Sequence, residues 1–158
     1  MNVIGRLPEA AEEEPLVVIG AHLDSVDTPG GNDNASGLAA MLEIAVMLTA
    51  DGVEYRFVAF GAEEIGLVGS EQYVAAMTPD EMERFAGAVI LDSIGHGTLL
   101  EISRADGNPG TMELTDRALE IAEAADLAAA ATVMPASDHA SFARAGLPAV
   151  LLSSTPYG

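Results

Sequence analysis

The sequence predicts a single α/β domain, a three-layer α/β/α sandwich in which helices cover both faces of a mostly parallel, mixed central sheet. Short apolar runs rich in Val and Ile alternate with longer segments of helical periodicity, the pattern typical of this class. The 158 residues match the length of one domain and contain no repeat, linker or low-complexity segment. Hydrophobic residues make up 49% of the chain, enough to form a substantial core.

The strand predictions rest on short apolar runs bounded by turn residues. The clearest is the segment 15–23, which is almost continuously apolar, as expected of a strand covered on both faces. The remaining predicted strands are residues 3–7, 55–61, 88–91, 99–103, 129–133 and 147–152.

The helix predictions rest on apolar residues that recur every three or four positions. Residues 34–50 carry such a stripe, and Asp51-Gly52 follows as a stop signal. Thr78-Pro79 is typical of the start of a short helix, and Gly146 is typical of the end of another. The other predicted helices are residues 67–77, 78–83, 111–128 and 137–145.

Charge and composition exclude several classes of protein. The chain has 25 acidic residues against six arginines and no lysine, a net charge of −19, so a nucleic-acid partner is not expected. Cysteine is absent, which excludes disulfides and thiolate metal ligands. No apolar run is long enough to span a membrane, and residues 1–7 lack the features of a secretory signal. The chain as given is therefore expected to be cytoplasmic.

Polar residues follow three of the predicted strands where each strand ends. His22 and Asp24 end the first, with Asp33 shortly after; Glu63-Glu64 end the second and Asp92 ends the third. Each group alone is commonly a capped or solvated turn. The carboxyl ends of parallel strands meet at one edge of a sheet, however, so we expect these side chains to converge.

The predicted cluster has the composition of a metal-dependent hydrolase site. Several carboxylates in one crevice repel one another unless a cation neutralises them. One imidazole with carboxylates and no thiolate favours Zn²⁺, with Mn²⁺ or Co²⁺ as substitutes. The ligands are too many for one ion but suit two ions roughly 3.5–4 Å apart that share a carboxylate. One carboxylate then remains to act as a general base.

Five motifs, in order, resemble those of the co-catalytic zinc aminopeptidases, a family that includes the bacterial leucyl aminopeptidases and has glutamate carboxypeptidase as a relative. The resemblance extends from Asn2 to Pro156. The motifs are His22-Leu-Asp24-Ser, Asn32-Asp33-Asn34-Ala-Ser-Gly37, Gly61-Ala-Glu63-Glu64-x-Gly66, Leu91-Asp92 and Ser137-Asp138-His139.

The resemblance implies a role for each matching residue. His22 and Asp92 would bind a first zinc ion, Asp33 would bridge two ions and Glu64 would bind the second. Glu63 would act as the general base for a zinc-activated water that attacks the scissile carbonyl, and would return the proton to the leaving amine. The expected substrate is a peptide that loses its N-terminal residue.

Further implications of the resemblance concern the surroundings of the metals. Asp24 would assist catalysis by orienting His22 and raising its basicity. Members of the family tend to have a cis peptide bond after the bridging aspartate, here between Asp33 and Asn34. The side chains expected along the substrate wall are Ser137, Asp138, His139 and Tyr157.

The sequence departs from the family pattern at both ends. The family's second zinc takes a final histidine after the last strand, but this chain stops at Tyr157-Gly158 without one, and it starts within the first strand. We therefore expect a single catalytic domain over residues 1–158 that lacks the N-terminal helices and the C-terminal segment with the last ligand. One zinc should bind firmly and a second weakly, unless His96 or His139 takes the missing place.

Three functions remain open from the sequence. The first is a zinc aminopeptidase or its catalytic core. The second is a related zinc hydrolase, a carboxypeptidase or a glutaminyl cyclase; the cyclase is disfavoured because its single zinc resembles the site that lacks a histidine here. The third is non-enzymatic: a metal-binding fragment, inactive or catalytically weakened, that folds and could self-associate as a homo-oligomer. Members of the family are often secreted.

Overall fold

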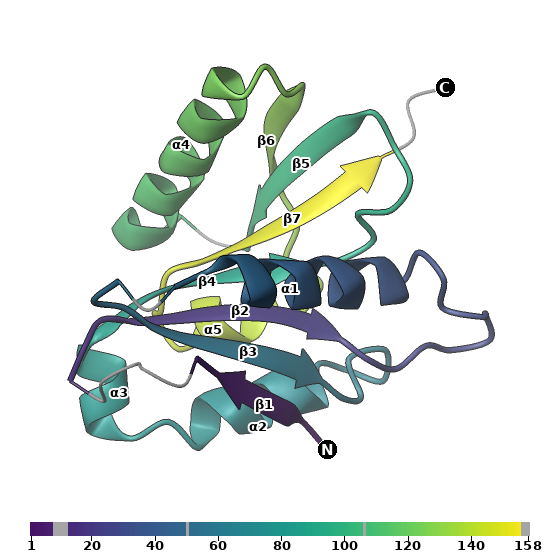
Figure 1. The fold of residues 1–158 in the computed structure, drawn as a ribbon. Helices are drawn as coiled ribbons and strands as arrows, with labels where there is room; N and C mark the ends of the chain where they lie inside the picture. Colours follow the sequence, from purple (N-terminus) through teal and green to yellow (C-terminus); the bar gives the residue numbers. More distant parts are fainter. Residues whose placement is uncertain (8–12, 50, 106, 156–158) are drawn as a thin grey trace.

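A seven-stranded mixed sheet forms the centre of the molecule (Figure 1). The structure is a computed structural model and describes residues 1–7, 13–49, 51–105 and 107–155. The strand order across the sheet is β1-β3-β2-β4-β7-β5-β6. The strands are β1 (Val3–Arg6), β2 (Leu16–His22), β3 (Glu54–Phe60), β4 (Phe85–Leu91), β5 (Leu99–Arg104), β6 (Ala129–Val133) and β7 (Ala149–Thr155).

Most neighbouring strands are parallel, as the sequence predicts. The pairs β2–β3, β2–β4, β4–β7 and β5–β6 are parallel, whereas β1 pairs with β3 and β5 pairs with β7 in antiparallel directions. The chain leaves β2 toward β3 and later returns to β4 on the other side of β2. The carboxyl ends of β2 and β4 therefore lie at a topological switch point, where open α/β sheets bind ligands.

Helices cover both faces of the sheet (Figure 1). One apolar cluster, which includes Phe60 and Phe142, lies between the sheet and the α2–α5 side. The other, which includes Phe57, lies beneath α1. Leu152 of β7 packs against this second cluster and also lines a groove with residues of α4, so α1 and α4 cover the same face. The helices are α1 (Ala35–Met47), α2 (Val68–Ala75), α3 (Pro79–Glu83), α4 (Pro109–Ala124) and α5 (His139–Arg144).

The three-layer α/β/α class and the order of elements are confirmed. The largest difference in boundaries is in α4, which ends at Ala124 although the sequence predicts helix to residue 128. Asp126 has a φ of 56°, a left-handed conformation that cannot continue a right-handed helix. Within the described residues, no helix is both long and apolar enough to cross a lipid bilayer.

Candidate metal centre

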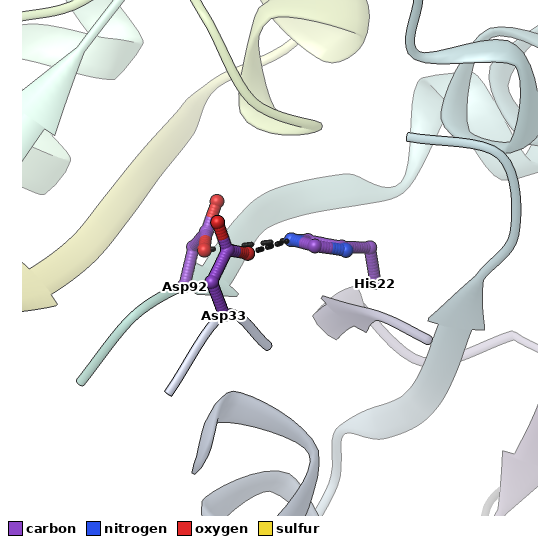
Figure 2. Close-up of side chains that lie close together, drawn as sticks. All are labelled: His22, Asp33 and Asp92. Atoms are coloured by element: carbon purple, nitrogen blue, oxygen red, sulfur yellow. Dashed lines mark ion pairs between the residues drawn. The ribbon is translucent and has the colours of Figure 1, made fainter. Parts of the chain in front are cut away.

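Two neighbouring parallel strands bring His22 and Asp92 together. His22 is the last residue of β2, and Asp92 directly follows β4. In the register of these strands Gly20 pairs with Ile90, so two residues further His22 lies level with Asp92. Asp33 enters from the turn that precedes α1, and the three side chains point toward one another (Figure 2).

The three side chains form a compact set of possible metal ligands. Nε2 of His22 lies 2.9 Å from Oδ1 of Asp33 and 3.5 Å from Oδ1 of Asp92. One ligand atom from each residue lies within 4.8 Å of the others. His22 is buried, the Asp92 side chain is 16% exposed and that of Asp33 is 52% exposed, so the set opens to solvent on the Asp33 side.

The backbone at Asp24 sets the orientation of the His22 ring. Nδ1 of His22 lies 3.0 Å from the Asp24 carbonyl oxygen, and because a carbonyl can only accept, Nδ1 carries the proton. Nε2, which faces the two aspartates, is then the nitrogen available to a metal. Asp24, the residue to which the resemblance assigns this orienting role, makes the contact through its backbone. Its carboxylate lies 3.8 Å from Nδ1 and accepts hydrogen bonds from the backbone amides of Glu63 (3.0 Å) and Glu64 (3.2 Å).

A hydrogen bond links the turn that carries Asp33 to the end of β4. The predicted cis peptide bond between Asp33 and Asn34 is confirmed. The buried Asn34 side chain donates to the Leu91 carbonyl (2.9 Å) and accepts from the Gly37 amide (3.0 Å), which caps α1. Asn34 therefore joins the start of α1 to the strand that ends at Asp92, and both aspartates are held in one frame.

The carboxylates around His22 favour its protonated form. Burial by itself would lower the pKa of the imidazole. The hydrogen bond to Asp92 and the charges of Asp92 and Glu63 outweigh burial and raise the pKa to about 9. Oδ1 of Asp33, 2.9 Å from Nε2, adds a further negative charge on the exposed side of the ring. The pocket thus attracts a cation, and a metal ion would compete with this proton.

Glu63 lies beside the three ligands in a setting suited to a base. Burial raises the pKa of its carboxyl to about 7; the charge of His22 opposes this, and the charges of Asp138, Asp92 and Glu64 add to it. A carboxyl that titrates near neutral pH can both take and return a proton. Glu64 is exposed and lines the same pocket as Asp33.

The side chains around the site enclose a pocket of about 330 Å³. Ser137 lines it and donates a hydrogen bond from Oγ to Oδ2 of Asp92 (2.8 Å). Asp138 and His139 are completely buried and lie beneath the pocket wall. Burial raises the pKa of the Asp138 carboxyl to about 6. Tyr157 lies outside the described residues, and His96 is exposed.

The pocket also has lining residues that the sequence analysis did not identify. They are Ser93, Met134, Ala136, Leu151 and Ser153. Two of them are serines, of which Ser93 donates a hydrogen bond from Oγ to Oδ1 of Asp92 (3.2 Å), and the other three are apolar. Residues of these types are common throughout the chain, so no motif marks them. Their one common signal is position, since each follows a strand end or lies in the last strand.

The donor set fits a zinc ion on chemical grounds. One imidazole nitrogen and two carboxylate oxygens from His22, Asp33 and Asp92 are borderline-hard ligands that Zn²⁺ accepts at about 2 Å. Within the part of the chain that the structure describes, no other histidine joins this set. Three protein ligands with an open side toward Glu63 and Glu64 are typical of a catalytic rather than a structural zinc site. Fold and site together define an α/β domain with a candidate metal centre at its topological switch point.

The chain belongs to Peptidase family M28, whose family model matches residues 2–158. Aminopeptidase YwaD of Bacillus subtilis is 43% identical over 98 residues, which cover 60% of this chain and 22% of that protein. A probable lipoprotein aminopeptidase, LpqL, of Mycobacterium tuberculosis is 48% identical over 91 residues, 54% of this chain and 18% of its own length. The resemblance inferred from the five motifs is thereby confirmed.

Solved structures of similar proteins share the fold over nearly the whole chain. The crystal structure of BSAP, a zinc aminopeptidase from Bacillus subtilis, superposes with a TM-score of 0.87 at 32% identity and covers 96% of this chain. An aminopeptidase from Aneurinibacillus sp. strain AM-1 gives 0.87 at 35% identity and covers 98%. The chain spans 39% of each of these two structures.

Proposed function

We propose that the protein is the catalytic domain of a zinc-dependent aminopeptidase that removes N-terminal residues from peptides. The observation that carries this proposal is the convergence of His22, Asp33 and Asp92 beside Glu63 in one open pocket. The relatives named above are aminopeptidases, which supports the substrate class. A glutaminyl cyclase of an Acidobacteriales bacterium is 22% identical and supports the fold alone.

Each group of residues in the pocket would have a separate role in catalysis. A zinc ion held by His22, Asp33 and Asp92 would polarise the scissile carbonyl and acidify water. Glu63 takes the proton of the attacking water and returns it to the leaving amine, for which its pKa of about 7 is suited. The exposed Glu64 would attract the positively charged α-amino group of the substrate.

A direct test is hydrolysis of leucine p-nitroanilide by the zinc-supplemented protein. We expect activity that a chelator abolishes and that Glu63→Gln lowers by about 10²- to 10⁴-fold, because a positioned base contributes that much. Glu113→Gln, which neutralises an exposed acid of α4, is the matched control and should retain activity. N-acetyl-leucine p-nitroanilide should not be cleaved, and equal cleavage of both substrates would contradict an aminopeptidase.

The number of ions bound is a second prediction. The first ligand set has three protein ligands, whereas among the described residues a second ion would have only Asp33 and the exposed Glu64. We therefore expect one zinc per chain after dialysis, measured by atomic emission, and a second ion that washes away. Asp92→Asn should remove the firmly held ion, whereas Glu64→Gln should leave it bound. Two ions per chain after exhaustive dialysis would overturn this expectation.

A further inference from the structure

One wall of the pocket is formed by residues 134–137 of the short connection between β6 and α5. Met134, Ala136 and Ser137 line the pocket from this segment. Its two ends are tied down: the Met134 amide donates to the Arg104 carbonyl (3.0 Å), and the Ser137 hydroxyl donates to Asp92 (2.8 Å). The segment thus contributes both an apolar surface and a contact to a metal ligand.

His139 holds this wall from inside the molecule. Its side chain is completely buried, and Nε2 lies 2.8 Å from the Met134 carbonyl oxygen. Since the carbonyl can only accept, Nε2 carries the proton and donates. His139 is the first residue of α5, and four of the other five residues of that helix are buried in the core, so the imidazole starts from a rigid support.

The Met134 side chain depends on this support for a defined position. Methionine is unbranched and flexible, so its placement in a pocket depends on the backbone that carries it. Met134 is partly buried and packs on the apolar cluster that contains Phe142 of α5. Loss of the hydrogen bond would leave a partly buried carbonyl without its donor and would free the segment to shift.

We propose that His139 is a positioning residue that sets the shape of the apolar pocket wall through the Met134 carbonyl, and thereby selects among apolar N-terminal side chains of the substrate. The selectivity for substrate side chains rests on the proposed aminopeptidase function, whereas the support of the wall by His139 does not. The support of the wall and the selectivity are therefore measured separately.

The support of the wall is measured by methyl NMR of protein labelled at the methionine ε-carbons. The Met134 signal, assigned with Met134→Leu, should sharpen and move toward its random-coil position in His139→Leu. It should stay near its wild-type position in His139→Gln, whose amide nitrogen can replace Nε2 as donor. The buried Met41 and Met77 report whether the fold persists. If His139→Leu does not fold, His139→Asn, which is too short to reach the carbonyl, takes its place.

The selectivity is measured as the ratio of kcat/KM for leucine and alanine p-nitroanilides. We expect the ratio to fall by about tenfold in His139→Leu, through KM, and to recover within about twofold in His139→Gln. His96→Leu, which removes an exposed histidine, should leave the ratio unchanged. An equal loss for both substrates, or an unmoved Met134 signal, would overturn the proposal. If the wild type cleaves neither substrate, the proposed function fails, and the NMR result still decides whether His139 supports the wall.

Discussion

At the scale of single residues, protonation governs the stability of the metal-free site. Three groups near the site, the buried His22 and Asp138 and the partly buried Glu63, bind protons more tightly in the folded chain than they would in water. The pKa of His22 rises from 6.5 to about 9, that of Glu63 from 4.5 to about 7 and that of Asp138 from 3.8 to about 6. The pKa values of Asp92, Glu54 and Glu81 are lowered instead, but these carboxyls are ionised in both states above about pH 6. Between about pH 6 and 9 the folded state therefore holds more protons than the unfolded state.

The sign of this difference gives a prediction for the chelator-treated protein. The stabilisation from His22 is fully present below about pH 6.5 and is lost as pH rises through about 9, and Glu63 and Asp138 act in the same direction at lower pH. We expect the Tm to fall steadily from about pH 6 to 9 at constant salt, followed by circular dichroism. In His22→Asn, the Tm should change little with pH above pH 7. A Tm that rises between pH 7 and 9 would contradict the pKa of His22.

At the scale of elements, the start of α1 couples helix capping to the candidate metal ligands. Asn34 caps the helix through the Gly37 amide, bonds to the end of β4 at Leu91 and directly follows Asp33. A Cβ on Gly37 would lie 2.2 Å from Oδ1 of Asn34 and 2.5 Å from the Leu91 carbonyl oxygen, so glycine is required for this close approach. The same few atoms therefore stabilise the helix and place a ligand.

Two cap substitutions separate these roles. Asn34→Ala should cost about 1–3 kcal/mol of unfolding free energy, because it removes a cap and leaves buried backbone groups unpaired. It should also weaken zinc binding by about tenfold or more, as expected for a group that orients a ligand. Asn108→Ala, which removes the cap of α4 at the Thr111 amide (2.8 Å), should cost about 1 kcal/mol without changing zinc affinity. Chemical denaturation and zinc titration measure the two effects; equal zinc affinity in both variants would refute the coupling.

At the scale of the whole molecule, negative charge is abundant and positive charge is concentrated. The net charge is −19, and three of the six arginines, Arg6, Arg56 and Arg84, pair with the buried Glu54 where β3 begins, at the opposite end of that strand from Glu63. Little positive charge remains to offset repulsion over the rest of the surface. The acidic surface thus opposes the compact state.

Added salt should therefore stabilise the protein. Screening shortens the range of repulsion from roughly 30 Å at 0.01 M to roughly 8 Å at 0.15 M ionic strength. We expect the Tm of the zinc-loaded protein to rise between 10 mM and 500 mM NaCl, measured by calorimetry at pH 7.5. An equal osmolality of sorbitol serves as the uncharged control. A Tm that falls with NaCl would show that ion pairs such as those of Glu54, rather than net repulsion, dominate.

The strand pattern and the candidate ligands were readable from the sequence because they depend on local rules. Side-chain periodicity identifies strands and helices, and the carboxyl ends of parallel strands meet at one edge, so His22, Glu63 and Asp92 could be placed together before any contact was known. The cis bond at Asp33 followed from the family resemblance.

Only the tertiary structure decided which atoms form the hydrogen bonds of the site and which side chains line the pocket. The Asp24 carbonyl is the nearest acceptor of the His22 Nδ1 proton, Met134 lines the pocket, and His139 is buried beneath the wall. The order of the strands and the antiparallel pairing of β5 with β7 were likewise not readable. These features depend on contacts between residues far apart in the chain, whose geometry is set by packing across the whole sheet and leaves no periodic signal in the sequence.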